Sequence, residues 1–332
     1  MQHVVLNGGS QVSIESAPDP TPGPGEVVIR MHCSALCGSE MKDYHGKGVS
    51  HSNGGHEAVG LVETIGPDVS RIAVGDRVGI SAVAGCGRSD CSPCNHGQST
   101  WCPEFRIFTG AHAELFKTSE TACLKVPEHI PDDIAVLLTG DGLGVPYHTG
   151  KKLGNTAGLK IAIFGVGPVG LSNIMVQKFY GAHVIAIDIS EYRLKEARRL
   201  GAEATIDARS EDAVKKIREW APGGVDIAME CAGHPQTLKQ CFDAVRHSGT
   251  VLINGEQPAV ELSPSEDFIR RDITAMGSWY YHVGEYPNML KLYQDGLPLG
   301  ELISHRIPYN EAAKGFALMA KGESAKVILQ YP

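Results

Sequence analysis

Hydrophobic residues follow two different rhythms along the 332-residue chain. Up to about residue 140, short β-branched runs are separated by turn signals such as DPTPGPGE, IGPD and AVGDR. Such runs are typical of strands, and we expect strands at residues 26–32, 58–65, 77–81, 113–117 and 123–126. This pattern predicts an irregular, mainly antiparallel β domain.

From about residue 159 the rhythm changes to apolar strands that alternate with helices. Strands are predicted at 159–165, 183–188, 204–206, 225–230, 250–254 and 273–278, and helices at 168–180, 190–202, 211–220 and 235–245. Strands that are apolar on both faces predict a parallel sheet covered by helices on each side. After residue 282 the pattern is mixed again, with helices near 285–295 and 311–321 and strands near 303–307 and 326–330.

Composition narrows the classes of function. Lysine and arginine total 30 against 38 aspartate and glutamate residues, a net charge of −8. This acidity opposes nucleic acid or an anionic membrane as a partner, because both select basic surfaces. No apolar run has the length of a membrane span and no export signal is visible. We therefore expect a cytoplasmic protein whose nine cysteines are metal ligands or buried thiols rather than disulfides.

One motif indicates a dinucleotide site. Residues 165–170 fit the pattern G-x-G-x-x-G, directly after an apolar strand and at the start of a helix. Glycines there permit a sharp turn and let a pyrophosphate approach the N–H groups of the helix N-terminus. The sequence thus predicts a doubly wound α/β (Rossmann) domain whose cofactor-binding residues include Gly165, Gly167, Pro168, Val169 and Gly170.

The next predicted strand ends at Asp188, which is placed to accept hydrogen bonds from the adenosine ribose. A carboxylate there repels a 2′-phosphate, so the sequence favours NAD over NADP. Arg193 follows within the next helix and has two interpretations. It can meet a cofactor phosphate, or it can form part of a solvated helix face between Glu191 and Glu196.

Four cysteines occur within an insert at about residues 83–103 that has too few apolar residues to build its own core. Four thiolates at this spacing suit a tetrahedral structural Zn²⁺, which would supply the missing folding energy. The four candidate ligands are Cys86, Cys91, Cys94 and Cys102. Cys37 and His56 are ambiguous when taken singly, because a buried thiol and a hydrogen-bonded structural histidine are common.

Together these motifs make the chain resemble the zinc-dependent medium-chain dehydrogenases, the family of alcohol, polyol and threonine dehydrogenases. The resemblance rests on CGSE at 37–40, GHEA at 55–58, GDRV at 75–78, the cysteine-rich insert, the glycine motif and KVIL at 326–329. It implies a GroES-like catalytic domain over residues 1–141 and 282–332, and a Rossmann domain over residues 142–281.

The resemblance also implies a catalytic Zn²⁺ held by Cys37, His56 and a third ligand, with one coordination position open. Asp141 matches that third ligand, and its alternative role is that of a helix N-cap. Ser39 matches the hydroxyl that receives the proton of the substrate. Glu57 matches an acid that orients or transiently replaces a ligand, and Glu40 matches an acid that holds the His56 ring.

Several positions depart from the family or are carried over from it alone. Family members commonly continue the proton path through a histidine where this chain has Lys42, which leaves Lys42, His45, the cofactor ribose or water as the exit. The first gap of the cysteine insert is four residues instead of two. Lys326 falls where relatives hold the pyrophosphate, and Gly233 and Gly255 fall at strand ends near the dinucleotide.

The function expected from the sequence is hydride transfer from a zinc-bound secondary alcohol or polyol to NAD, giving the ketone or aldehyde. A sugar or amino-alcohol dehydrogenase of the same family is one alternative, and a redox-silent NAD-binding sensor is another. We expect one catalytic and one structural zinc per chain, a small-molecule substrate, and a homodimer or homotetramer. The aromatic run at 279–282 is interpreted either as packing or as part of a substrate pocket.

Overall fold

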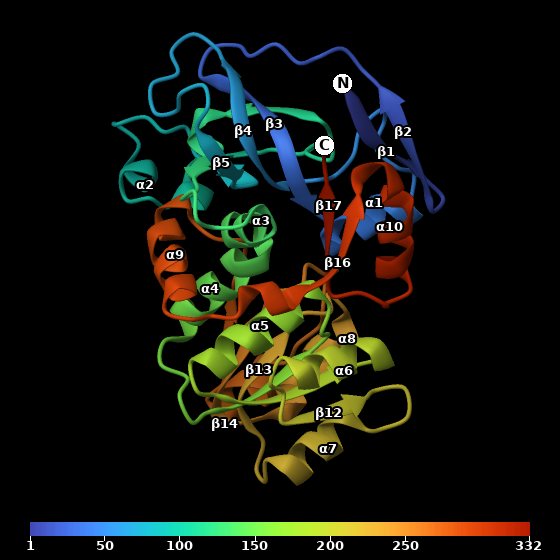
Figure 1. The fold of residues 1–332 in the computed structure, drawn as a ribbon. Helices are drawn as coiled ribbons and strands as arrows, with labels where there is room; N and C mark the ends of the chain where they lie inside the picture. The colour runs from blue at the N-terminus through green and yellow to red at the C-terminus, as the bar shows by residue number, and fades with distance from the viewer. The chain divides into compact units, whose positions relative to one another are not determined.

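The computed structural model describes all of residues 1–332, which form two compact units. The first unit contains Met1–Gly144 and Tyr280–Pro332, and the second contains Val145–Trp279. Figure 1 shows the first unit in blue to green and orange-red, and the second in green to light brown. Each unit is built around its own sheet, as described in turn below.

The second unit has a six-stranded parallel sheet in the order β12-β11-β10-β13-β14-β15. The prediction of a doubly wound parallel sheet is therefore confirmed. The elements in chain order are β10 (Lys160–Phe164), α5 (Pro168–Phe179), β11 (His183–Asp188), α6 (Glu191–Arg199), β12 (Ala204–Asp207), α7 (Ala213–Trp220), β13 (Val225–Glu230), α8 (Pro235–Ala244), β14 (Val245–Ile253) and β15 (Thr274–Gly277).

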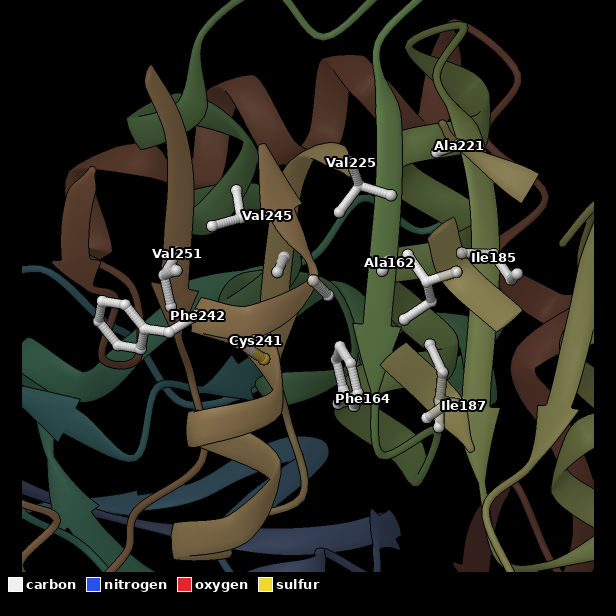
Figure 2. Close-up of a cluster of buried hydrophobic side chains, with 14 of the residues drawn as sticks. Ala162, Phe164, Ile185, Ile187, Ala221, Val225, Cys241, Phe242, Val245 and Val251 are labelled. Atoms are coloured by element: carbon white, nitrogen blue, oxygen red, sulfur yellow. The ribbon is translucent and has the colours of Figure 1, made fainter. Parts of the chain in front are cut away.

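Strand β10 explains why the central strands are apolar at every position. Ala162 and Phe164 belong to a buried cluster with side chains of α7 and α8, and Figure 2 shows Phe164 near Ile187 and Cys241. Ile161, which alternates with them along the strand, is also fully buried. Successive side chains point to opposite faces of a sheet, so both faces of this sheet are covered.

The first unit has a seven-stranded sheet in which β16-β17-β3-β4-β5-β9 are neighbours and β8 also pairs with β3. Only the β16–β17 pair is parallel, so the expectation of a mainly antiparallel β domain is confirmed. The bounds of the strands are β1 (Gln2–Gly8), β2 (Gln11–Ser16), β3 (Glu26–Ala35), β4 (Glu57–Ile65), β5 (Arg77–Ile80), β6 (Val83–Ala84), β7 (Arg106–Ile107), β8 (Leu115–Ser119), β9 (Cys123–Lys125), β16 (Ile303–Pro308) and β17 (Lys326–Gln330).

Helices connect these strands, and four of them fall where the sequence pattern predicted none. The two longer ones are α3 (Asp132–Thr139) and α4 (Asp141–Leu153), and α4 begins with a candidate ligand. Residues 134–139 of α3 are all buried, so the helix lacks the polar face that marks an amphipathic pattern. The other helices of the first unit are α1 (Met41–His45), α2 (Ser92–Asn95), α9 (Tyr286–Gln294) and α10 (Ala312–Ala320).

Two aromatic residues of the run at 279–282 pack inside the first unit. The Tyr281 hydroxyl donates to the carbonyl of Thr139, and its ring leaves no room for a side chain at Gly144. The Tyr280 hydroxyl accepts the N–H of Ala82 at 2.5 Å. The contacts of Tyr281 thus pack the start of α4 within the first unit. None of the helices combines the length and the hydropathy needed to cross a membrane.

Candidate metal centre and dinucleotide site

Three segments that are distant in the sequence meet at one end of the seven-stranded sheet. Cys37 lies just after β3 and His56 just before β4, and the register pairs Ala35 with Glu57. Asp141 is the first residue of α4. Cys37, His56, Glu57 and Asp141 place their ligand atoms within 4.8 Å of one another.

The donor set fits a tetrahedral zinc ion. Oδ2 of Asp141 lies 3.3 Å from Cys37 Sγ and 3.2 Å from His56 Nε2. Tetrahedral bonds of the usual Zn–S, Zn–N and Zn–O lengths separate such ligand atoms by about 3.4–3.6 Å. Oδ1 of Asp141 is buried and has no hydrogen-bond partner, which a bound cation would explain.

The charges at this cluster favour a cation. Burial opposes protonation of His56, but the neighbouring Asp141 and Cys37 raise its pKa well above the ordinary value. Asp141 is buried too, and the charge of His56 lowers its pKa. The His56 Nδ1–H donates to the carbonyl of Gly54 at 2.8 Å, which leaves Nε2 facing Asp141. A histidine fixed in this way is oriented as metal-ligating histidines are.

Glu57 and Lys326 form a buried ion pair beside these groups. Both side chains are almost fully buried, and the Lys326 ammonium contacts Oε1 of Glu57 and donates to the carbonyl of Leu36 at 3.2 Å. Oε2 of Glu57 accepts the N–H of Gly142 at 3.3 Å. Burial raises the pKa of Glu57 to about 7, although Lys326 opposes this shift. Lys326, expected at the pyrophosphate, is thus placed by the structure against a carboxylate of its own unit.

The candidate proton path begins at an exposed group. Ser39 lies in a short 3₁₀ helix, Gly38–Glu40, and is exposed, as is Lys42 in α1. His45 Nδ1 is 3.0 Å from the Ser10 hydroxyl. The ring of His45 therefore has a protein partner, whereas the Lys42 carbonyl accepts the Gly46 N–H at 2.9 Å and its side chain shows no hydrogen bond.

The expectation that Glu40 holds the His56 ring is wrong. Glu40 extends past Gly54 and pairs with His112, whose Nε2 lies 3.0 Å from Oε1. The other oxygen of Glu40 accepts the N–H of Cys37 at 2.9 Å. Burial opposes ionisation of Glu40, but His112 lowers its pKa. His112 was not singled out from the sequence, because a lone histidine in GAHAEL carries no local signal.

The cysteine insert places four sulfur atoms together. Sγ of Cys86 lies 3.8 Å from Sγ of Cys94, and the same distance separates Cys91 from Cys102. A tetrahedral Zn²⁺ with Zn–S bonds of about 2.3 Å gives sulfur separations of about 3.8 Å. All four ligand atoms lie within 4.8 Å of one another, so the donor set fits a structural zinc.

The lengthened gap between the first two cysteines contains an exposed arginine that forms an ion pair with Glu104. Arg88, one of the four residues in the gap, donates from Nη1 to Glu104 at 2.7 Å. Asn95 donates to the carbonyl of Ser89 from the other side of the loop. These contacts tie the longer loop to residues on both sides of Cys102.

The glycine motif has the backbone form that a pyrophosphate site needs. Gly165 has a φ of +83°, and a Cβ there would lie 2.6 Å from the Cα of Ala232. A Cβ at Gly170 would overlap the carbonyl oxygen of Gly165. Gly167 precedes α5 as its N-cap and Pro168 is its first residue, so the N-terminal N–H groups of the helix are available to an anion.

Asp188 is buried at the end of β11 and binds the glycine loop directly. Its Oδ2 accepts the N–H of Val166 at 2.7 Å, and its Oδ1 accepts the N–H groups of Ile189 and Ser190 at 2.7 and 2.8 Å. A carboxylate offers about four acceptor directions, so one remains for a ribose hydroxyl. The Arg193 guanidinium stands about 4 Å from where a Gly167 Cβ would lie.

Glu230 at the end of β13 was missed by the sequence analysis. It is fully buried and accepts hydrogen bonds from the Ala232 N–H at 2.9 Å, the Gly233 N–H at 3.0 Å and the Thr237 hydroxyl at 2.7 Å. A side chain at Gly255 would collide with it. The sequence pattern does not indicate that Glu230 binds the backbone after β13, because a glutamate at a strand end is usually solvated.

A parallel sheet with a dinucleotide loop and a β unit with two zinc-type donor sets define a metal-dependent dehydrogenase. Comparisons with known proteins agree. The description "Alcohol dehydrogenase GroES-like domain" matches residues 23–128, and "Zinc-binding dehydrogenase" matches residues 168–295.

Relatives extend over nearly the whole chain. L-Threonine 3-dehydrogenase of Bacillus licheniformis is 32% identical over 97% of this chain and 96% of its own length. Sorbitol dehydrogenase of Gallus gallus is 28% identical over 98% and 95%. The structure of alcohol dehydrogenase TADH from Thermus sp. ATN1 is 28% identical and superposes with a TM-score of 0.87 over all of both chains.

The chain belongs to the zinc-dependent medium-chain dehydrogenase family. It is therefore an oxidoreductase whose cofactors are zinc and a nicotinamide dinucleotide. The sequence predictions of family, fold class and reaction class are confirmed.

Proposed function

We propose that this enzyme oxidises a secondary alcohol or polyol with NAD, and that Cys37, His56 and Asp141 hold the catalytic zinc. The observation that carries the proposal is the convergence of these three ligand atoms at tetrahedral spacing. Cys86, Cys91, Cys94 and Cys102 would hold the second, structural zinc. A Cys/His/Asp set gives a neutral metal centre, because two anionic ligands balance the charge of Zn²⁺.

Bound zinc would act as a Lewis acid that lowers the pKa of the substrate hydroxyl. The exposed Ser39 hydroxyl would accept the proton of that hydroxyl and pass it toward solvent, because a hydroxyl both accepts and donates. Lys42 is the candidate next group on this path. Glu57 would keep the start of α4 in place through the Gly142 N–H, and Lys326 neutralises its charge inside the protein.

The proposed preference for NAD rests on Asp188. Its carboxylate retains one acceptor direction after binding three N–H groups, and it would repel a 2′-phosphate. Gly165, Gly167, Pro168, Val169 and Gly170 would face the pyrophosphate. Arg193 stands beside Gly167 and would add a positive charge to that side of the cofactor.

An amino-alcohol substrate is the second candidate, and the relatives named L-threonine 3-dehydrogenase favour it. The relative named sorbitol dehydrogenase instead agrees with a polyol. Both kinds of substrate carry a secondary hydroxyl group with a polar neighbour. The same metal centre would serve either one.

The test is NADH formation over a panel of primary alcohols, secondary alcohols, polyols, sugars and amino alcohols, with and without a chelator. Chelator-sensitive activity on secondary alcohols or polyols supports the main proposal, and selective activity on L-threonine supports the second. Metal analysis should give about two zinc ions per chain. A zinc-replete protein that binds NAD and oxidises nothing on the panel would favour a redox-silent sensor.

We also propose that the enzyme is a cytoplasmic homodimer or homotetramer, as the sequence analysis expects. Size-exclusion chromatography with light scattering measures its mass in solution. A mass of 35.5 kDa, that of one chain, would refute an oligomer.

A further inference from the structure

A series of buried, hydrogen-bonded polar groups lies behind the candidate catalytic ligands, and the proposed chemistry gives these groups no role. Nε2 of His112 lies 3.0 and 3.2 Å from the two oxygens of Glu40. Nδ1 of His112 lies 2.8 Å from the Ser34 hydroxyl, which lies 2.9 Å from the Tyr331 hydroxyl. His112, Glu40 and Ser34 are at most 1% exposed.

One end of this series supports Cys37. The Cys37 N–H donates to Oε2 of Glu40 at 2.9 Å. The position of the Glu40 carboxylate therefore fixes the backbone that carries the thiolate ligand and, two residues later, Ser39. Because His112 contacts both oxygens of Glu40, the histidine ring fixes the carboxylate in turn.

The His112 ring also supports the loop that carries His56. Gly55 packs against the ring so closely that a Cβ would lie 2.6 Å from Cγ of His112. Oδ1 of Asn53 accepts the N–H groups of Gly55 and His112 at 3.0 and 3.1 Å. The carbonyl of Gly55 accepts the Ala111 N–H at 2.9 Å. The two loops that carry Cys37 and His56 thus both contact the same histidine ring.

We propose that His112 is a positioning residue for the catalytic metal centre, and that its ring sets the spacing of the Cys37 and His56 loops. The inference rests on the proposed function, which makes Cys37 and His56 metal ligands. Groups behind metal ligands typically change metal affinity about 10- to 100-fold when they are replaced. The effect expected here is of that size, because His112 supports two ligands at once.

Two variants separate the hydrogen bonds of the ring from its shape. His112→Phe keeps a flat ring in contact with Gly55 but cannot bond Glu40 or Ser34. His112→Gln retains a side-chain amide N–H that can donate to Glu40. Ser34→Ala removes the partner of Nδ1, which is also the partner of the Tyr331 hydroxyl, but leaves the contact between His112 and Glu40 in place. It serves as a milder variant if His112→Phe does not fold.

The readout is metal affinity at the catalytic site, measured by competition with a chelator and by the visible absorption of Co²⁺-substituted protein. His112→Phe should weaken Co²⁺ at the Cys37 site about 10- to 100-fold and change its spectrum. The four-thiolate site should keep its metal, and the Kd of NAD should stay within about twofold. His112→Gln should recover part of the lost affinity. In His112→Phe, kcat should fall by a larger factor than the KM for NAD changes.

His32→Gln is the matched control, because His32 also pairs with a carboxylate, at 3.0 Å from Asp132, and belongs to the same unit. It should leave the Co²⁺ affinity and spectrum unchanged. Wild-type metal affinity and a wild-type spectrum in His112→Phe would overturn the inference but not the proposed function. An equal loss of Co²⁺ affinity in His32→Gln would do the same. A wild-type chain that binds metal only at the four cysteines would overturn the proposed function and the inference with it.

Discussion

Replacing Asp188 by alanine tests how the enzyme selects its cofactor. The carboxylate has one acceptor direction left for a ribose hydroxyl after binding three N–H groups. A hydrogen bond to a charged group contributes about 1.5–3 kcal/mol, so Asp188→Ala should weaken NAD about 10- to 150-fold.

NADP should respond in the opposite direction. A 2′-phosphate that carries about two negative charges would be repelled by about 1.7 kcal/mol at a separation of about 5 Å in water-like surroundings, and the variant removes this repulsion. The two effects together shift the ratio of NAD to NADP affinity by about 200- to 3,000-fold. Arg193 stands beside Gly167, and its positive charge would favour the added phosphate.

Isothermal titration calorimetry of each cofactor measures both constants, and a thermal melt reports any damage from the unpaired Val166 N–H. Asp207→Ala is the matched control. Asp207 is the register partner of Asp188 on the adjacent strand and pairs with Arg209 at the surface. An equal loss of NAD and NADP affinity in Asp188→Ala, or the same shift in Asp207→Ala, would refute the assignment.

Three further predictions concern the metal centre, the buried ion pair beside it, and the acid stability of the first unit. Cys37→Ala should abolish turnover because a zinc ligand is lost, while calorimetry finds the Kd of NAD within about twofold; wild-type turnover would remove Cys37 from the metal. Lys326→Met leaves Glu57 buried without its partner, so urea unfolding should show a loss of about 3–5 kcal/mol, and Lys326→Met with Glu57→Gln should recover part of it. The hydrogen bond from His32 holds the pKa of Asp132 below its usual range despite partial burial. This hydrogen bond therefore stabilises the fold at pH values above the ordinary pKa of an aspartate. The stabilisation is lost as the pH falls through the lower pKa that Asp132 has in the folded state. Asp132→Asn should flatten the acid limb of a thermal-melt series, and an unchanged limb would contradict this.

The elements that could be predicted from the sequence are those specified by neighbouring residues. The strand that ends at Phe164, the glycine turn and helix α5 lie within about twenty consecutive residues, and apolar period, glycine spacing and proline at the first helical position agree there. Asp188 could be predicted because the motif fixes its distance along the chain. The four cysteines could be predicted because their clustering in a polar insert has one common explanation.

The groups behind the ligands could not be predicted, because their partners depend on length and position in three dimensions. Glutamate at position 40 has one more methylene group than an aspartate would have. That extra length takes its carboxylate past Gly54 to His112. No periodicity in the sequence links residue 40 with residue 112, and the contact exists because both lie behind the paired ends of β3 and β4.

Lys326 and Glu57 show how strand register controls the electrostatics of the site. Strand β17 pairs antiparallel with β3, with Ile328 opposite Ala35, and β3 pairs with β4, with Ala35 opposite Glu57. Continuing β17 two residues back from Ile328 takes Lys326 beyond the end of β3, beside the Leu36 carbonyl and Glu57. A slip of one residue would turn the lysine to the other face of the sheet and leave a buried carboxylate unpaired, at a cost of several kcal/mol. The ion pair therefore specifies the register of the last strand, and that register keeps the charge beside Cys37 and Asp141 balanced.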